Sequence, residues 1–495
     1  MNVESGKVLA IDQSTSATKA VVFDVLGRGV DRFSIEHRAI YPRPGFVEHD
    51  AEELWRNTQS VIQFAAEKHQ DFICISITNQ RETFVIFDRA TGRPLHNAVV
   101  WQCRRGEEVC DELIRSGHAE LVTVKTGLKV DSYFSAPKLT ALLRGNPDLK
   151  SRLQSGDALF GTIDTYLLYR LTRCKTFATD STNASRTLLF NINTLKWDSE
   201  LCDLFEVSIS ALPEVRDSCS QFGFCDSPAL PANLPIAGVM GDSQAALFGL
   251  RCFKPGEAKV TIGTGSSILL NAGPRVPPGG VRTIAWTQNG DATYCREGII
   301  SYSGATITWL RDQLGLIQSA DEAEEGARAV SDNAGVYLIP AFTGLSAPYW
   351  SSTARAAIVG LTASSTRNHV LRAALESIAY QIKDSLDDMM EGVNVPLTLI
   401  HADGGATRNR FLMQFIADIA GTDIVVSDTA DNSPLGAAFA GMLGIRVYAT
   451  IDHLKHLVIE KQVYRPKMAR AVAIALHAGW SLAIRQVVNA KLEAS

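Results

Sequence analysis

The segment LAIDQSTSATKAVVFD, Leu9 to Asp24, places a polar turn between two apolar runs. The runs from Val8 to Ile11 and from Ala20 to Phe23 predict short buried strands, so we expect Asp12 to Lys19 to form the turn that joins them. Hydroxyl and backbone N–H groups in a tight turn can bind an anion, and an acid at a strand end can hold a hydrated metal ion. For this segment taken alone, an ordinary Ser/Thr turn is the alternative interpretation.

A second segment repeats this pattern. EAKVTIGTGSSILLNAG, Glu257 to Gly273, again has an apolar run, a turn of small residues and another apolar run. Elsewhere, strand-like runs such as Phe72 to Ile77 alternate with helical stretches such as Ala51 to Lys68, which is typical of α/β proteins. We therefore predict two related α/β domains, residues 1–248 and 249–495, with a ligand held between the two polar tips.

The composition narrows the class of protein and of partner. An apolar fraction of 46% in 495 residues is enough for sizeable cores. The net charge of -5, without a long run of Lys or Arg, argues against nucleic acid or a membrane surface as partner. No apolar run is expected to span a membrane. Nine scattered cysteines without paired spacing favour reduced thiols and a cytoplasmic location, and we expect small-molecule partners.

A third loop of small residues, HADGGATRN (His401 to Asn409), lies between a strand-like run and a helical stretch. Gly404 and Gly405 permit close approach of a ligand to the backbone, and the N-terminus of the following helix suits a nucleotide. A plain strand-to-helix loop explains one such segment equally well. Three of them in one chain favour a nucleotide site, although neither the P-loop pattern nor the complete dinucleotide-binding pattern is present.

Acidic residues also follow apolar runs. Asp242 begins the segment DSQAALFG after PIAGVMG, and Arg81 and Glu82 follow the run that ends in ITNQ. Helix capping by Asp242 and a surface ion pair between Arg81 and Glu82 are the alternatives. Phosphoryl transfer requires an anion-binding cradle, a metal ion near an acid, and a carboxylate that accepts the proton of the attacking hydroxyl. Asp12 and Asp242 are the candidates for the metal and proton-accepting roles.

Taken together, these segments resemble the FGGY carbohydrate kinase family, and within it the glycerol kinases, from about Val8 to Gly444. The motifs that carry the resemblance include GFVEHDAEELW, ITNQRET, NAVVWQCRR, DSYFSAPK, GTIDTYLLY, TNASRTLLFNI, GDSQAALFG, GTGSS, PAFTGLSAPYW and DGGATRNRFLMQFIADIAGT. The resemblance implies two ribonuclease-H-like domains of the actin and hexokinase type, with ATP and Mg²⁺ in the interdomain cleft. It also implies a homodimer or homotetramer.

The resemblance implies roles for individual residues. It makes Asp242 the general base toward a primary hydroxyl, and it assigns Mg²⁺ to Asp12 and Asp242. It assigns the ATP phosphates to both hairpins, through Thr15, Ser16, Lys19, Thr264 and Gly265. It assigns the adenosine side to Gly304, Thr308, Gly405, Ala406 and Asn409. It assigns the substrate, a polyol with polar and C–H edges, to Arg81, Glu82, Trp101, Tyr133, Asp242, Ser243 and Ser267.

Four positions of the predicted site depart from the usual glycerol kinase pattern, and in addition Ala141 stands where the first family signature carries Trp. Ser243 stands where those enzymes carry Gln, and Ser267 stands where they carry Phe, so the resemblance implies a larger and more polar substrate pocket. In the first hairpin, Ser14 replaces Gly and Lys19 replaces Arg. Lys19 keeps the charge, but it is a point charge and not a bidentate phosphate clamp.

We therefore expect an ATP-dependent kinase that acts on a primary hydroxyl of a four- or five-carbon polyol or ketose. One alternative is a glycerol kinase proper, which makes glycerol 3-phosphate. An alternative from another class is a non-catalytic, actin-like ATP-binding switch, which shares the fold without a sugar pocket. Such a switch has no need of the polyol-binding set Arg81, Glu82, Trp101 and Tyr133.

Overall fold

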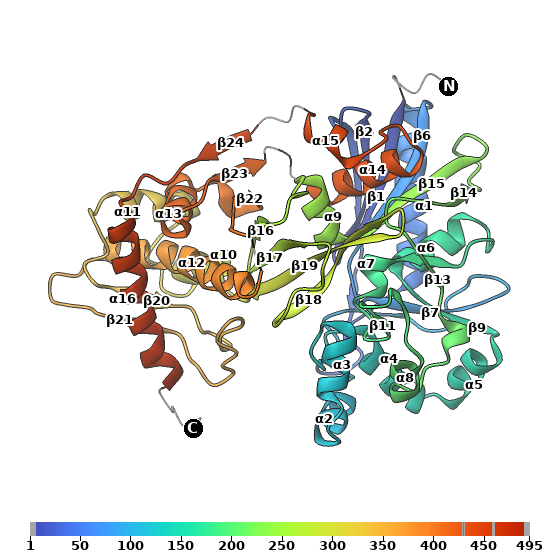
Figure 1. The fold of residues 1–495 in the computed structure, drawn as a ribbon, viewed down its shortest axis with the longest axis horizontal. Coiled ribbons are helices and arrows are strands. Elements are labelled where there is room, and N and C mark those ends of the chain that lie inside the picture. Colours follow the sequence, from blue (N-terminus) through green and yellow to red (C-terminus); the bar gives the residue numbers. More distant parts are fainter. Residues whose placement is uncertain (1–5, 394, 428, 430, 458–460, 490–495) are drawn as a thin grey trace.

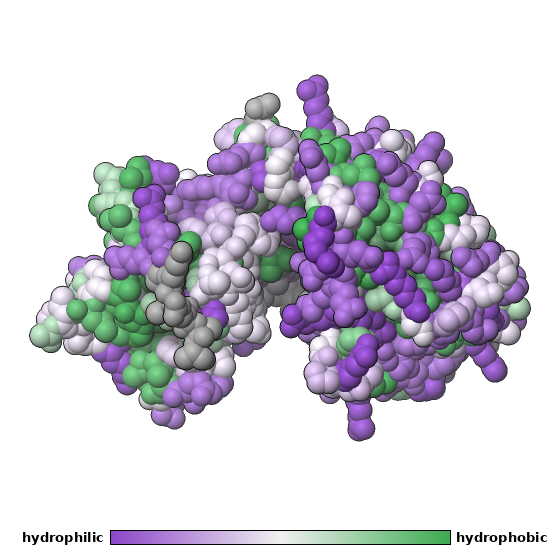
Figure 2. All heavy atoms as spheres, turned by 90° about the horizontal axis from the view of Figure 1, so that it is seen from below, coloured by the Kyte–Doolittle hydropathy of each residue, from purple (hydrophilic) through white to green (hydrophobic). Residues whose placement is uncertain are grey.

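The computed structural model describes residues 6–393, 395–427, 429, 431–457 and 461–489. Two bodies, each built on a β-sheet that carries helices, lie beside one another (Figure 1). The face drawn in Figure 2 is hollowed between them. This arrangement is the two-body α/β architecture that the repeated hairpins predict.

The N-terminal body is built on a six-stranded mixed sheet in the order β14-β15-β6-β1-β2-β3. Its strands are β14 (Gln221–Cys225), β15 (Leu234–Gly241), β6 (Phe72–Asn79), β1 (Lys7–Gln13), β2 (Ala17–Asp24) and β3 (Gly29–Glu36). Alternate residues of β1 enter two cores: Leu9 and Ile11 pack with helix α1 (Ala51–Lys68), whereas Val8 and Ala10 pack with helix α14 (Asn432–Gly444). Helices therefore cover both faces of the sheet, which explains why the four residues of β1 that follow Lys7 are all apolar.

The C-terminal body is built on a seven-stranded sheet in the order β18-β19-β17-β16-β22-β23-β24. Its strands are β18 (Val281–Gln288), β19 (Asp291–Ile300), β17 (Ser266–Gly273), β16 (Glu257–Ile262), β22 (Leu399–Asp403), β23 (Ile424–Ser427) and β24 (Lys461–Tyr464). Its core includes the long helix α12 (Arg367–Met390) and α13 (Arg410–Ala420). In the first body β1 pairs with β2 antiparallel and with β6 parallel, and in the second β16 pairs with β17 antiparallel and with β22 parallel.

Smaller elements surround the two main sheets. A five-stranded sheet contains β4 (Ala39–Ile40), β5 (Glu48–His49), β8 (Ala98–Val99), β7 (Phe84–Asp88) and β9 (Ala158–Thr162). Three strand pairs are β10 (Ala178–Asp180) with β13 (Glu214–Arg216), β11 (Phe190–Asn191) with β12 (Lys196–Trp197), and β20 (Tyr337–Ile339) with β21 (Ala357–Val359). The helices of the first half are α2 (Glu107–Arg115), α3 (Ala119–Thr126), α4 (Ser135–Arg144), α5 (Pro147–Ser155), α6 (Ile163–Leu171), α7 (Ser181–Ala184), α8 (Ser199–Leu204) and α9 (Asp242–Gly249). Those of the second half also include α10 (Gly304–Asp312), α11 (Ala320–Arg328), α15 (Ile451–Lys455) and α16 (Arg470–Asn489).

Both predicted hairpins are present, but the first turn is shorter than expected. Strand β1 continues through Gln13 and β2 begins at Ala17, so the turn contains only residues 14–16. The prediction that Asp12 to Lys19 forms the turn was therefore wrong in length. The physical reason is that Asp12 and Lys19 face one another across the ladder and form an ion pair at 2.9 Å, which extends the strands into the polar segment.

Two C-terminal helices differ from the simplest expectation. Helix α14 belongs to the second half of the chain, but it packs on the N-terminal sheet and against α9 (Figure 1). The division of the chain into domains at residues 248 and 249 therefore stays a proposal. Among the described helices, α16 alone is long and apolar enough to cross a membrane, and the expectation that no run reaches this length was wrong. In the structure, Trp480, Ala483 and Ile484 of α16 belong to the C-terminal core, and burial of an amphipathic helix accounts for these apolar residues.

Candidate active site

The first hairpin joins β1 to β2 and presents an acid and a lysine together. Asp12 is 4% exposed, and burial raises the pKa of its carboxyl group more than the neighbouring Lys19 lowers it. The turn is held closed by Ser14, whose backbone N–H and hydroxyl both donate to the carbonyl of Ala17. The Trp101 indole N–H donates to the Thr15 hydroxyl at 2.9 Å, so the hairpin tip is tied to an aromatic side chain expected at the substrate.

Asp242 lies where β15 ends and helix α9 begins. Gly241 is the N-cap residue of α9, so the helix-capping alternative for Asp242 is not observed. The carboxylate accepts the backbone N–H of Ser243 at 2.7 Å and lies 3.4 Å from Nε of Arg81. Its side chain is 37% exposed, and withdrawal from bulk water raises the pKa of Asp242 more than Arg81 lowers it.

A cleft cavity of about 260 Å³ brings together residues from both bodies. Of the predicted site residues it is lined by Asp12, Lys19, Asp242, Ser243 and Ser267. The first three are the acid–lysine pair of one hairpin and the proposed base, and the two serines are the positions that depart from the family pattern. The Ser267 hydroxyl is buried and has no hydrogen-bond partner among the described residues.

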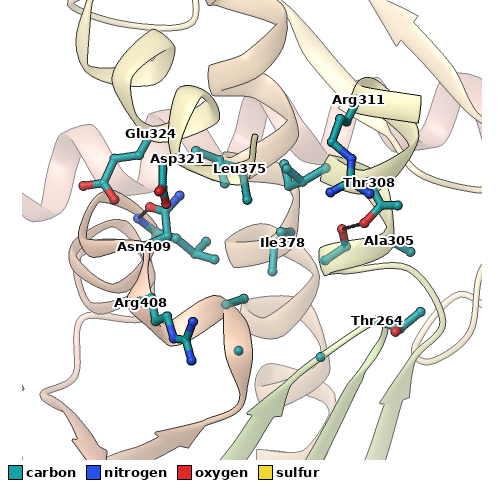
Figure 3. A pocket seen from close by; sticks show the side chains of 17 residues that line it. Thr264, Ala305, Thr308, Arg311, Asp321, Glu324, Leu375, Ile378, Arg408 and Asn409 are labelled. Atoms are coloured by element: carbon teal, nitrogen blue, oxygen red, sulfur yellow. Dashed lines mark hydrogen bonds between the residues drawn. The ribbon is translucent and has the colours of Figure 1, made fainter. Parts of the chain in front are cut away.

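A second cavity of about 460 Å³ lies in the C-terminal body (Figure 3). It is lined by the predicted residues Thr264, Gly304, Thr308, Gly405, Ala406 and Asn409. Leu375 and Ile378 of α12 form an apolar wall between Thr308 and Asn409, which suits the flat face of a nucleobase. Asn409 also caps α13, because its side chain accepts the backbone N–H of Leu412.

The two cavities share the same loops. Thr264 of the β16–β17 hairpin lines the larger cavity, and Thr261 of the same hairpin lines the cleft cavity. Gly405 lines the larger cavity, and the adjacent Gly404 lines the cleft cavity. Gly404 has φ +97°, and a Cβ there would lie 2.5 Å from the carbonyl oxygen of Ile262, so only glycine fits. A nucleotide in the larger cavity could therefore extend its phosphates past these loops into the cleft.

Arg81 and Glu82 form a buried network with two residues that the sequence analysis did not single out. Arg81 donates to Glu297 at 2.7 Å, and Arg186 donates to Glu82 at 2.6 Å and to the second oxygen of Glu297 at 2.5 Å. All four side chains are at most 6% exposed. The expected alternative of a surface ion pair between Arg81 and Glu82 was therefore wrong: each pairs with another partner, away from water.

Glu297 joins the two bodies, because β19 belongs to the C-terminal sheet and both arginines belong to the N-terminal half. The two guanidinium groups lower the pKa of Glu297 to about 2 despite its burial. Glu297 therefore stays a carboxylate at neutral pH and fixes the positions of Arg81 and, through Arg186, of Glu82.

The two predicted aromatic residues adjoin this network. The rings of Trp101 and Tyr133 pack edge to face with centroids 5.4 Å apart, and Arg186 lies 5.9 Å from the Tyr133 ring centre. Neither aromatic residue lines the two cavities described above, nor do Arg81, Glu82, Thr15, Ser16 and Gly265. Arg81 reaches the cleft through its ion pair with Asp242 at 3.4 Å, and Trp101 donates a hydrogen bond to Thr15 at the tip of the first hairpin. Gly265 lies in the second hairpin, where a Cβ would meet the Ile300 carbonyl oxygen at 2.3 Å.

Lys259 and Asp403 are further cleft residues that the sequence analysis missed. A signal for Lys259 was present: Ala258, Val260 and Ile262 are buried in the C-terminal core, so the period of two sends Lys259 and Thr261 to the opposite face of β16. For Arg186 and Glu297 the sequence gives no local signal, because Arg186 is separated from Glu82 by 104 positions and from Glu297 by 111.

Within the described residues, no three His, Cys, Asp or Glu side chains are close enough to hold a metal ion by themselves. The cleft nevertheless fits Mg²⁺ delivered with ATP, since Mg²⁺ is commonly bound by one or two carboxylates together with waters and substrate phosphates. Asp12 and Asp242 line one cavity and offer such carboxylates.

The fold and the site define an ATP-dependent phosphotransferase of the actin and hexokinase type, with an alcohol group as acceptor. Residues 7–249 match the N-terminal domain, and residues 258–445 the C-terminal domain, of the FGGY family of carbohydrate kinases. The chain belongs to this family. The alternative of a non-catalytic, actin-like switch is therefore set aside.

Several glycerol kinases are similar over nearly the whole chain. Glycerol kinase 1 of Thermotoga maritima is 44% identical over 489 residues, which cover 97% of this chain and 99% of that protein. The glycerol kinase of Caldanaerobacter subterraneus subsp. tengcongensis is 44% identical over 97% of this chain and 98% of its own. The crystal structure of Plasmodium falciparum glycerol kinase with ADP has a TM-score of 0.93 and 36% identity, covering 98% of both chains. A xylulose kinase of Lactobacillus acidophilus, at 21% identity and a TM-score of 0.88, shares the fold over 98% of this chain and 99% of its own.

Proposed function

We propose that this enzyme transfers the γ-phosphoryl group of ATP to a primary hydroxyl of glycerol and makes glycerol 3-phosphate. The observation that carries the proposal is the 44% identity to glycerol kinases over 97% of the chain. The preference for a four- or five-carbon substrate, which the sequence suggested, has less support. The relatives are glycerol kinases, and they favour the alternative that glycerol is the substrate.

The geometry supports a direct in-line transfer. Asp242 would accept the proton of the attacking hydroxyl, and Arg81, 3.4 Å from its carboxylate, favours its ionised form against the effect of burial and orients it. The adenosine would occupy the larger cavity, between the α12 wall and Asn409, and the phosphates would meet both hairpins. When bound, Mg²⁺ would be held near Asp12 and Asp242 and would neutralise phosphate charge. Arg81 and Glu82, held by Arg186 and Glu297, would bind the remaining hydroxyls.

A four- or five-carbon polyol or ketose is a second candidate, favoured by one observation. The buried Ser267 hydroxyl has no partner among the described residues, and Ser243 lines the same cavity. An additional CHOH unit could satisfy these hydroxyls, whereas glycerol would leave them unpaired. Unpaired polar groups and a methylene-sized gap would each weaken the binding of glycerol relative to a longer substrate, by about 1 to 3 kcal/mol.

The deciding measurement is kcat/KM for glycerol against erythritol, threitol, erythrulose, xylitol, ribulose and xylulose. We expect glycerol to exceed all of them at least tenfold, and a longer substrate that wins would contradict the proposal. The double variant Ser243→Gln with Ser267→Phe provides the matched control. If the wild type prefers glycerol, the double variant should change little the ratio of kcat/KM for glycerol to kcat/KM for the longer substrates. If the wild type prefers a longer substrate, the double variant should raise this ratio.

We also propose a cytoplasmic location and a homodimer or homotetramer. All nine cysteines are free thiols, and eight of them are buried, which suits a reducing compartment. The oligomeric state follows from the family resemblance, and sedimentation equilibrium of the purified protein would test it.

A further inference from the structure

Lys259 is a buried lysine that lines the cleft cavity from the C-terminal body. It lies on β16, opposite Leu269 of β17 and His401 of β22, and its residue exposure is 2%. Among the described residues, its ammonium group has no hydrogen bond and no acid within 4 Å. In its ammonium form, Lys259 therefore has no counter-ion in direct contact among the residues that the structure describes.

The other charged groups of the cleft already have partners. Lys19 is bound to Asp12 at 2.9 Å, and Asp242 lies 3.4 Å from Arg81. Asp403 accepts the side-chain amide of Asn432 at 2.9 Å, although its second oxygen is buried without a partner. Asp403 and Asp242 attract the ammonium of Lys259 from beyond ion-pair distance, and burial still lowers the pKa of Lys259.

Such an arrangement works against folding. A buried ammonium without a hydrogen-bonded counter-ion loses its hydration and gains little in return, so its removal is expected to leave the fold intact or to stabilise it. Groups that are unfavourable for stability and that face a reaction cavity are commonly kept for function. An anionic ligand that entered this cavity would give the ammonium group of Lys259 the counter-ion that the described residues do not supply.

We propose that Lys259 is a catalytic residue that binds the phosphoryl group during its transfer. As the bond between the γ-phosphorus and the oxygen of ADP breaks, a bond forms between that phosphorus and the substrate oxygen, whose proton passes to Asp242. Lys259 keeps its protons and donates them as hydrogen bonds to the phosphoryl oxygens, from the body opposite the first hairpin. Charge spread over those oxygens is what a fixed, dehydrated cation stabilises best.

The inference requires only phosphoryl transfer to an alcohol, and it is independent of whether glycerol is the substrate. The test variant is Lys259→Met, which keeps the length of the side chain and removes its charge. We expect kcat to fall about 10²- to 10³-fold, as for loss of one preorganised donor, while KM for the alcohol changes less than threefold. Lys175→Met, at a surface lysine that is 74% exposed, serves as the matched control and should retain wild-type kcat.

Stability separates a catalytic role from a structural one. Lys259→Met should have a Tm equal to or above that of the wild type, because an unpaired buried charge has been removed. A lower Tm together with parallel losses in kcat and in binding of both substrates would overturn the proposal, and so would failure of this variant to fold.

A binding measurement tests the role without turnover. Calorimetric titration with ADP alone should give a similar Kd for wild type and Lys259→Met. Titration with ADP, Mg²⁺ and aluminium fluoride, which mimics the transferred phosphoryl group, should show at least a tenfold weaker Kd for the variant. Equal affinity of both proteins for the mimic, or a kcat within threefold of the wild type, would refute the assignment.

Discussion

Replacement of Glu297 by Gln removes the carboxylate that joins Arg81 to Arg186. The carboxylate accepts from these arginines at 2.7 and 2.5 Å, and its side chain is 1% exposed. Removal of one partner from a buried ion network costs about 3 to 5 kcal/mol, because the remaining charges stay buried. The lowered pKa gives a similar figure: the shift from 4.5 to about 2 corresponds to about 3 kcal/mol of stabilisation of the ionised form.

The same shift predicts how the effect depends on pH. Because the folded-state pKa lies below the unfolded value, the stabilisation is fully present above pH 4.5 and is lost as pH falls toward 2. Urea unfolding should therefore show a deficit of about 3 to 5 kcal/mol for Glu297→Gln at pH 7. The deficit should become smaller below pH 4.5, where the wild-type carboxylate also begins to lose its advantage.

In activity assays, Glu297→Gln should change KM for the polyol much more than KM for ATP. Arg81 and Glu82 lose their fixed positions, so KM for the polyol should rise at least about tenfold, while KM for ATP stays within twofold. Glu214→Gln is the matched control, since Glu214 pairs with Arg216 at 2.7 Å but is 62% exposed. An exposed pair contributes at most about 1 kcal/mol. A loss for Glu297→Gln no greater than that of the control, with an unchanged polyol KM, would refute the positioning role of this network.

Two further predictions concern the base and the cleft. Asp242→Asn should lower the single-turnover rate about 10²- to 10⁴-fold while ADP binding stays nearly unchanged, because only the proton acceptor is removed; a loss of less than tenfold would contradict its role. The two hairpins belong to different sheets and must converge while water is excluded, so small-angle scattering should show compaction with polyol and a non-hydrolysable ATP analogue. An unchanged radius of gyration with both ligands bound would argue against closure of this cleft.

Local features of the fold could be read directly from the chain. Helix α1 is observed over the same residues as predicted, since its apolar face is periodic and Asp50 caps it by accepting the backbone N–H of Glu52. Both hairpins and the loop at Gly404 also lie where the pattern of apolar and small residues placed them. The exact turn of the first hairpin could not be read, because the Asp12–Lys19 pair becomes apparent only once the strands are in register.

The nucleotide side of the site was also accessible to sequence reasoning. The residues proposed for it come from three short segments: the β16–β17 turn, the start of helix α10 and the loop after β22. Residues within one short segment stay together in space, so the family resemblance can assign them segment by segment. The six predicted residues that line the larger cavity illustrate this. The membrane-length helix α16 shows the converse, since an apolar composition alone does not say whether a helix is buried in a core.

Tertiary structure alone decided which charges meet. Glu82 and Arg186 are separated by 104 positions in the chain, and Arg186 and Glu297 by 111, so no local pattern predicts their pairing. Whether a lysine is paired is equally non-local: Lys19 forms an ion pair with Asp12 on the neighbouring strand, whereas Lys259 has no acid within ion-pair distance in the part of the chain that the structure describes. Periodicity determines which face of a strand a side chain occupies, but the energy of a charge depends on everything that surrounds it in three dimensions.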